Sequence, residues 1–362
     1  MTVRDLWQRL IAPIDSPLMT MAALLLAYAL LVVSSASLER IGAQLMNMLV
    51  ALVVMRLAAQ VPPQRLMYFA LPIFVGALLL LVAVALFGDV SKGARRWLNL
   101  GFMRIQPSEI MKIAMPLMLA WYFQRHETFL RLREYVVAAI LLLAPVALIA
   151  RQPDLGTAIL VLAAGFWVIF LAGLPWKVLG GLVLAAVAAA PLAWSMLHEY
   201  QRNRILTLLD PEADPLGKGF HIIQSTIAIG SGGIFGKGWG QGTQAQLEFI
   251  PERHTDFIFA VLSEEFGLLG NTLLLVLYAL LIGRGMMIAA NAPTLFTRLL
   301  AGSITLIFFT YAFVNMGMVS GLLPVVGVPL PFVSYGGTSL TTLFVGIGIL
   351  MSIHKHRMLV QK

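Results

Sequence analysis

Ten apolar stretches of about twenty residues run through this chain and constrain its fold more than any other feature. A helix of that length crosses about 30 Å of hydrocarbon. The stretches cover approximately residues 17–37, 42–60, 66–87, 108–123, 135–150, 156–173, 176–197, 256–283, 298–320 and 336–354. Because the three between 108 and 173 are shorter than the norm, the count is accurate to about one helix. We therefore predict an all-α polytopic membrane protein with about ten transmembrane helices.

Composition supports this fold class and excludes several others. Of the 362 residues, 59% are hydrophobic and 12% are charged, against about 25% charged in a soluble domain. Too few charged residues remain to cover soluble domains of this total length. With no cysteine, disulfides, thiolate nucleophiles and cysteine-ligated metals are excluded. We expect one integral membrane domain over residues 1–362, in which 198–255 is the only large loop.

The distribution of basic residues predicts the orientation. The net charge is +8, but the 25 Lys and Arg are scattered between apolar runs, which favours anionic lipid and phosphate as partners over nucleic acid. Ten helices place both termini on one side. Cytoplasmic termini put 13 of the 25 bases inside and seven outside once the loop 198–255 is set aside, since the positive-inside rule has least force in long loops. That loop, between helices seven and eight, is then extracytoplasmic.

Ionisable residues near the outer helix ends are the first candidates for a site, since a charge at mid-membrane costs about 2.5–3.5 kcal/mol. Arg95 and Arg96 precede Trp97 in a segment typical of the membrane interface. Glu109 and Lys112 share one face at the start of the fourth helix. They are either substrate contacts or a simple interfacial ion pair.

Two breaks between helices offer further candidates. Arg151 and Asp154 bracket Pro153 in a very short connection, which indicates either a broken helix pair facing a cavity or an ordinary tight loop. The segment 331–337 contains proline and a polar glycine turn and cannot continue a helix. At membrane depth it must lie against protein or a water-filled cavity.

Carboxylates at the start of the eighth helix form the next group. Asp256 lies at the outer end of a long apolar helix, where it could act as a general base or serve as a helix N-cap. Glu264 and Glu265 lie about two turns deeper. They should find at least one basic or polar partner inside the bundle.

A glycine-rich segment, 230–242, has seven glycines in thirteen positions. It matches neither the P-loop, because Gly238 stands where Ser or Thr should bind magnesium, nor GxGxxG. Its backbone could approach a phosphate or sugar closely, or it could serve as a hinge.

Together these segments resemble the signatures of the SEDS family (shape, elongation, division and sporulation). The match runs in order from about residue 88 to the C-terminus. The matching segments are KGARRW (92–97), QPSE (106–109), QPDLGT (152–157), RHTDFIF (253–259) and PFVSYGG (331–337). Details at 251–256, 328–332 and 351–357 resemble the rod-shape branch more than the division branch.

The resemblance implies a peptidoglycan glycosyltransferase in the bacterial cytoplasmic membrane. Such an enzyme polymerises the undecaprenyl-pyrophosphate-linked disaccharide lipid II on the outer face during elongation and shape maintenance. The resemblance also implies partners: a class B penicillin-binding protein, which is a transpeptidase that crosslinks the strands, and other membrane proteins of the elongation complex. We expect a divalent cation, Mg²⁺ or Mn²⁺, and no organic cofactor.

The family also assigns roles to residues of this chain. Its catalytic aspartate falls on Asp256, and its other functional positions fall on Arg104, Gln106, Glu109, Lys112 and Asp154. With Arg95, Arg96, Lys218 and Ser334 these complete the predicted substrate-binding set. The sequence does not predict the metal ligands.

The expected mechanism is an inverting displacement. Asp256 removes the proton of the acceptor hydroxyl, while a cation and the bases Arg104 and Lys112, assisted by Arg95 and Arg96, hold the leaving pyrophosphate. Two other functions stay open: a lipid II flippase and a noncatalytic scaffold for the crosslinking enzyme. A flippase needs ionisable groups through the depth of the bundle or on both sides, and a scaffold does not need Asp256.

Overall fold

The computed structural model describes residues 14–357 except 92–93, 100, 102–103, 128–129, 198, 216, 218, 248 and 251. Ten of its helices match the ten predicted stretches, which confirms the helical membrane fold. They are α2 (Ser16–Ala36), α3 (Ile41–Ala58), α4 (Pro63–Phe87), α5 (Pro107–Arg125), α6 (Leu132–Arg151), α7 (Leu155–Leu171), α8 (Trp176–Met196), α12 (Ile258–Ala290), α13 (Leu295–Val319) and α14 (Gly337–His356). Seven of the described helices are long and apolar enough to cross a membrane, whereas the apolar parts of α7 and α8 are shorter.

Local sequence explains where these helices begin. Asp15 caps α2, since its Oδ1 accepts a hydrogen bond of 3.0 Å from Leu18 N. Pro63 and Pro107 occupy the first positions of α4 and α5, where the missing N–H of proline costs nothing. Thr294 forms a capping box with Thr297 at the start of α13. Each cap satisfies backbone donors that would be costly to leave unpaired in a membrane.

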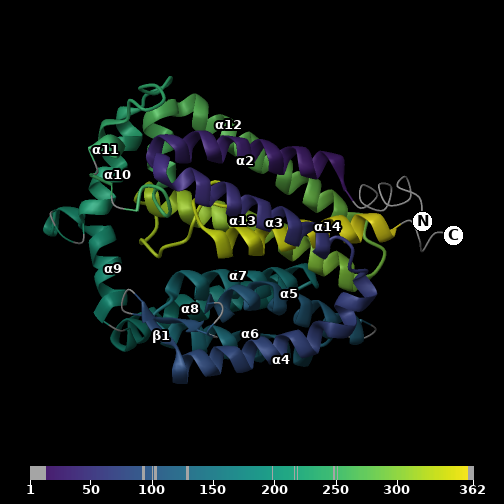
Figure 1. Cartoon of the computed structure of the whole chain (residues 1–362). Coiled ribbons are helices and arrows are strands. Elements are labelled where there is room, and N and C mark those ends of the chain that lie inside the picture. Colours follow the sequence, from purple (N-terminus) through teal and green to yellow (C-terminus); the bar gives the residue numbers. More distant parts are fainter. Residues whose placement is uncertain are drawn as a thin grey trace, which may run out of the picture.

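The helices pack in three groups around α13 (Figure 1). In that view α2 and α12 lie at the top, α3, α13 and α14 in the middle, and α4 to α8 below. Helix α13 is buried along most of its length and packs against α5, α7, α12 and α14. Ser303 on α13 donates to Ala164 O at 2.7 Å, and Trp167 donates to Thr310 Oγ1 at 2.9 Å. These bonds join the middle group to α7.

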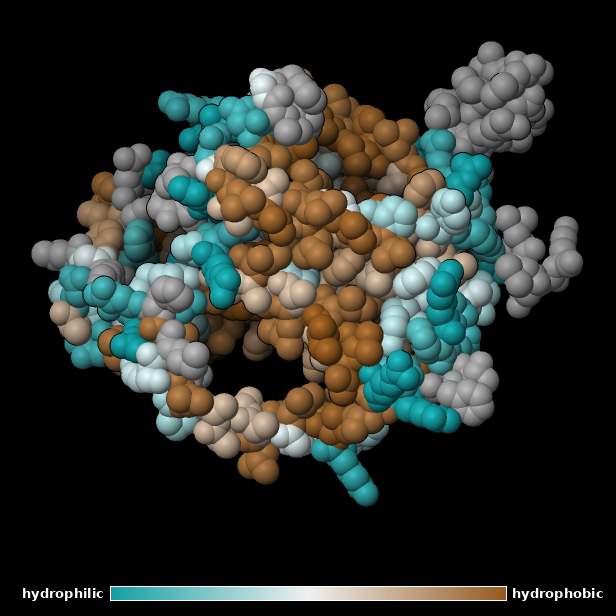
Figure 2. Space-filling model, turned by 90° about the horizontal axis from the view of Figure 1, so that it is seen from below, coloured by the Kyte–Doolittle hydropathy of each residue, from teal (hydrophilic) through white to brown (hydrophobic). Residues whose placement is uncertain are grey.

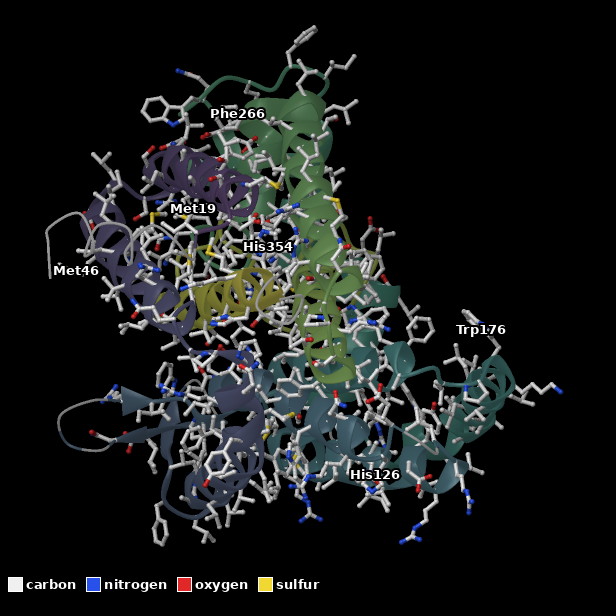
Figure 3. All side chains as sticks on the ribbon, turned by 90° about the vertical axis from the view of Figure 1, so that its right-hand side faces the viewer. Met19, Met46, His126, Trp176, Phe266 and His354 are labelled. Carbon is white, nitrogen blue, oxygen red and sulfur yellow. The ribbon has the colours of Figure 1, made fainter. Side chains whose placement is uncertain are left out.

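Helices α2 and α14 meet at one end of the bundle. There Arg284 of α12 forms a bidentate ion pair with Asp15, and His354 Nε2 lies 3.3 Å from Asp15 Oδ2. Figure 3 looks onto this end, with Met19 and His354 labelled. The start of the first helix and the end of the last helix therefore lie on the same side of the bundle.

The surface matches a membrane protein. Figure 2 shows a broad hydrophobic band across the molecule, with hydrophilic residues gathered toward both ends. Helix α8 stands apart from this bundle, and Trp176 at its start lies away from the other labelled side chains in Figure 3. Most of its described residues are exposed; Val178 and Leu179 are half-buried. An opening edged by hydrophobic residues is visible in the lower part of Figure 2.

The segment before α5 departs from the all-helical prediction. It forms a small antiparallel sheet with the order β1 (Asp89–Ser91), β2 (Ala94–Asn99) and β3 (Arg104–Ile105). Asp89 pairs with Trp97, and Leu98 pairs with Ile105. The strands carry no alternation of polar and apolar residues that would signal them, and inter-strand pairing satisfies the backbone between two helices.

The long loop is itself largely helical. It contains α9 (Glu199–Leu209), the 3-10 turn Pro211–Ala213, α10 (Phe220–Ser231) and α11 (Thr243–Gln246). On the left of Figure 1 these elements connect the lower group of helices to the upper one. They cover the end of the bundle that is opposite Asp15.

The glycine-rich segment packs against a break in α12. Helix α12 is interrupted at Gly267, where φ is 61° and ψ is −155°. Backbone N–H groups of Lys237 and Gly238 donate to Glu264 O and Glu265 O, each at 3.0 Å. Leu268 N and Leu269 N donate in return to Gly233 O and Ile234 O. The segment therefore supplies the hydrogen bonds that the broken helix lacks.

The two glutamates before this break have polar partners, as predicted. Glu264 is fully buried, and its Oε1 accepts from Lys237 Nζ at 2.7 Å and from Thr243 Oγ1 at 3.0 Å. Glu265 accepts from Ser35 Oγ of α2. Both carboxylates thus hold the glycine-rich segment and α2 against α12.

Gly236→Ala tests this packing. A Cβ at Gly236 would lie 2.1 Å from Glu265 O, and φ is +78° there, so the backbone must move. We expect a loss of about 1–3 kcal/mol of stability, measured as a lower melting temperature of the purified protein in detergent. Gly230→Ala is the matched control, because nothing lies within 4 Å of its Cβ position. Equal melting temperatures for the two variants would contradict the packing described.

Candidate active site

A cavity of about 270 Å³ lies where α5, α7, α12 and α14 begin and α13 ends. Six of the ten predicted site residues line it. The described residues that line it are Arg96, Gln106, Glu109, Lys112, Asp154, Thr157, Leu160, Glu252, Thr255, Asp256, Gly327, Pro329, Tyr335, Thr338 and Ser339. Segments more than 200 residues apart in the sequence therefore meet around one space.

Asp256 lies in the turn that leads into α12. The residue at the N-cap position is Phe257, so Asp256 stands one residue further out and is not the helix cap. Its side chain is half-buried and lines the cavity. This placement does not match the capping interpretation, and the catalytic role of Asp256 stays a prediction.

The backbone around Asp256 is held from two sides. Asn315 Nδ2 of α13 donates to Asp256 O at 2.8 Å and to Val328 O at 2.7 Å. Ser334 Oγ donates to Thr255 O at 2.7 Å, and Tyr335 N donates to His254 O at 2.9 Å. The loop before α14 and the end of α13 thus fix the position of the carboxylate.

Unusual backbone conformations accompany this arrangement. Glu252 has φ 53° and Phe332 has φ 64°, values that cost a non-glycine residue about 1–3 kcal/mol and concentrate at functional sites. Gly327 has φ +75°, and a Cβ there would lie 3.3 Å from Asp256 Oδ2. The glycine leaves room for the loop backbone beside the carboxylate.

Asp154 forms the opposite wall. It caps α7 by accepting from Thr157 N at 3.3 Å and is only 5% exposed. Gln106 Nε2 donates to Asp154 Oδ2 at 3.4 Å, and Arg96 Nε lies 3.8 Å from the same oxygen. Arg96 also donates to Pro153 O at 2.9 Å. The break between α6 and α7 therefore faces the cavity through Asp154, while Arg151 is exposed.

Glu109 and Lys112 form a buried ion pair at the cavity. Lys112 Nζ lies 2.6 Å from Glu109 Oε1 and donates to Tyr311 OH at 2.6 Å. Their side chains are 4% and 11% exposed for Lys112 and Glu109, so the pair is not an interfacial surface contact. Glu109 Oε2 has no hydrogen-bond partner among the described residues. A buried acceptor of this kind is available to a bound molecule.

Three predicted site residues lie elsewhere in the described part of the chain. Arg95 and Arg104 are exposed on β2 and β3, and Arg95 points to the opposite face from Arg96 because side chains alternate along a strand. Ser334 is buried and holds backbone, accepting from Leu330 N at 2.7 Å. Lys218 lies outside the described residues.

Sequence reasoning missed other residues. Glu252, Thr255 and Tyr335 line the cavity within motifs that were recognised, but they were not singled out. Asn315 is fully buried in α13. A buried amide near the end of an apolar helix is a signal that could have identified it.

The carboxylates of the cavity are the candidate ligands for a metal ion. Among the described residues no three His, Asp or Glu side chains gather closely enough to hold one. Glu252 and Asp256 nevertheless line the same cavity, and Mg²⁺ commonly binds one or two carboxylates together with substrate phosphates. The donor set fits a cation that is bound jointly with the substrate.

Curated proteins of known name are similar to this chain over most of its length. The chain is 53% identical over 353 residues to the peptidoglycan glycosyltransferase MrdB of Escherichia coli K12, covering 96% of this chain and 95% of that protein. It is 34% identical to the peptidoglycan glycosyltransferase RodA of Treponema pallidum, covering 79% and 83%.

Solved structures are similar over nearly the whole chain. One, described as coordinating polymerization and crosslinking in a peptidoglycan synthase complex, has a TM-score of 0.82, 36% identity and coverage of 95% and 98%. The rod shape determining protein RodA of Thermus thermophilus has a TM-score of 0.72, 31% identity and coverage of 95% and 97%. The model of the cell cycle protein family FtsW/RodA/SpoVE matches residues 15–359. The chain belongs to this family, the SEDS family.

Proposed function

We propose that this protein is a peptidoglycan glycosyltransferase that polymerises lipid II during cell elongation, with Asp256 as the general base. One observation carries the mechanism: Asp256 lines a polar cavity, and the backbone of residues 254–256 is held by hydrogen bonds from Asn315, Ser334 and Tyr335. A base must be held in place before it can take a proton from a positioned hydroxyl. The glycosyltransferase names of the relatives support the reaction class.

The reaction is a displacement at the anomeric carbon of the donor sugar. Asp256 takes the proton of the acceptor hydroxyl, and the acceptor oxygen bonds to the anomeric carbon from the face opposite the diphosphate. The bond between that carbon and the diphosphate oxygen breaks, and both bonding electrons leave with the undecaprenyl diphosphate. The configuration inverts. Because diphosphate is a weak base, it leaves without being protonated, and neutralisation of its negative charge assists its departure.

The cavity supplies only part of that positive charge. Arg96 is half-buried at the wall, whereas Lys112 is already paired with Glu109. We propose that Glu252 and Asp256, together with the diphosphate, would hold a divalent cation that would supply the remainder. Its contribution is to neutralise charge on the departing group.

Transport is less well supported than catalysis. The cavity is lined from one end of the bundle, and the buried carboxylate at the other end, Asp15, is already paired with Arg284. A transporter needs a path of ionisable groups between the two sides. The noncatalytic scaffold is separated from the enzyme by the Asp256 variants below.

We further propose where the protein acts and with what. The excess of basic residues on the side of Asp15 predicts that this end is cytoplasmic, which places the cavity on the outer face of the cytoplasmic membrane. The structural relative that coordinates polymerization and crosslinking supports a class B penicillin-binding protein as the partner.

Asp256→Asn and Asp256→Ala are expected to abolish polymerisation of purified lipid II. Loss of a general base costs about 10²–10⁴-fold in rate. The measurement is glycan chain formation by the purified protein, with and without its crosslinking partner. Asp210→Asn is the control, because Asp210 is an exposed carboxylate in the same loop. Polymer made by the folded Asp256 variants would overturn the assignment.

The buried Glu109–Lys112 pair allows a test that separates support of the fold from contact with the substrate. Lys112→Met leaves Glu109 buried without its partner, at a cost of about 3–5 kcal/mol. The double variant Glu109→Gln, Lys112→Met should recover most of the melting temperature but remain inactive. If the double variant polymerised lipid II normally, the pair would be purely structural.

The cation proposal predicts a dependence on divalent metal. A chelator should stop polymerisation, and Mg²⁺ or Mn²⁺ should restore it. Glu252→Gln should raise the metal concentration needed for half-maximal activity, while the melting temperature without metal stays unchanged. Activity that is insensitive to chelation would contradict the proposal.

A further inference from the structure

A second and larger pocket lies inside the helical loop. It has a volume of about 540 Å³ and is formed by α9 and α10 with Val325 beside them. Its polar lining includes Tyr200, Asn203, Arg204 and His221. The mechanism proposed above uses neither Arg204 nor His221.

This pocket lies next to the Asp256 cavity. The imidazole of His221 stacks on the ring of Phe257, with centroids 5.6 Å apart and an interplanar angle of 21°. Phe257 directly follows Asp256 in the chain. Arg204 is close enough to Arg96, Asp154 and Asp256 to interact with their charges. Arg204 therefore lines the second pocket, and its charge acts on residues of the Asp256 cavity.

Arg204 has an unused donor. Its Nη1 is buried and has no hydrogen-bond partner among the described residues, although its guanidinium carbon lies 5.9 Å from the centroid of the Tyr200 ring. Burial lowers the pKa of Arg204, yet an arginine stays charged at neutral pH. A buried cationic donor without a partner is costly, and a bound anion would remove that cost.

His221 complements the arginine. Its Nδ1 is buried and has no partner in the described part of the chain. Burial lowers the pKa of His221, an effect that Glu252 opposes, so the ring is neutral at pH 7. A neutral imidazole has one donor and one acceptor nitrogen, which suits the hydroxyl groups of a sugar.

The charge balance of the Asp256 cavity also indicates that the diphosphate needs a base from outside its lining. Among the described residues that line that cavity, four are carboxylates, Glu109, Asp154, Glu252 and Asp256, and two are basic, Arg96 and Lys112. Arg95 and Arg104, which were expected to help hold the diphosphate, are exposed on the sheet. A diphosphate at the edge of this cavity therefore needs a further base, and Arg204 of the adjoining pocket can supply it.

We propose that Arg204 binds the diphosphate of the lipid-linked donor at the junction of the two cavities, and that the pocket beside it, with His221, holds part of the attached saccharide. Arginine presents a planar fork of donors that matches phosphate oxygens. This assignment rests on the glycosyltransferase function proposed above and adds a donor subsite to it.

The test uses the purified full-length protein and undecaprenyl diphosphate as a competitive inhibitor. Arg204→Gln should raise both KM for lipid II and Ki for undecaprenyl diphosphate by about 10- to 100-fold. Arg204→Lys should be intermediate, because it keeps the charge but loses the fork. Arg202→Gln is the control: it removes the same charge from α9, and Arg202 is bonded to Trp194 O and Ser195 O. Melting temperatures report whether each variant is folded.

The outcomes separate this inference from the function itself. Unchanged KM and Ki in folded Arg204→Gln, with wild-type polymerisation intact, would overturn the donor subsite alone. A second result would also overturn it: Arg204→Gln keeps the wild-type Ki, but its polymerisation activity no longer depends on added phosphatidylglycerol. Arg204 would then bind membrane phospholipid. If the wild-type protein failed to polymerise lipid II, the proposed function would be wrong. Calorimetric titration of undecaprenyl diphosphate into the wild type and Arg204→Gln would still decide whether Arg204 binds the diphosphate.

Discussion

The interaction on which the site depends is the set of hydrogen bonds that hold the irregular backbone before α12. At the edge of a membrane, unpaired N–H and C=O groups are costly, so a non-helical segment needs partners within the protein. Asn315 reaches Asp256 O and Val328 O, and Ser334 reaches Thr255 O. These two side chains bind two loops to each other, and the Asp256 carboxylate projects into the cavity as a consequence.

The same constraint explains the glycine-rich segment. Helix α12 breaks at Gly267, and the backbone of residues 233–238 supplies the missing hydrogen bonds. Such close approach requires glycine: a Cβ at Gly232 or Gly236 would lie about 2 Å from a carbonyl oxygen of α12. The segment that suggested a phosphate loop thus joins the large loop to the bundle, and through the loop it places Arg204 and His221 beside the cavity.

Much of the site could be read from the sequence, because charged residues near apolar helix ends are rare and conspicuous. Asp154, Glu109 and Asp256 all line the cavity as expected. Arg95 and Arg104 lie outside the cavity lining, because the interfacial segment forms strands, and strand alternation turns Arg95 away from Arg96. Asn315 and Arg204 escaped notice because a single amide or arginine has no local signature until its partners are known.

The sequence alone determined the helical bundle and the positions of its ten helices, because hydrophobic length and charge scarcity are local properties of a chain. The role expected of Asp256 came from the resemblance of its motif to the SEDS family. Tertiary structure decided which charges meet. Lys112 pairs with Glu109 and Tyr311. Arg95 and Arg104 are exposed on the small sheet, and Arg204 lines the pocket beside the Asp256 cavity. These outcomes depend on contacts between segments far apart in the chain, which no local pattern specifies.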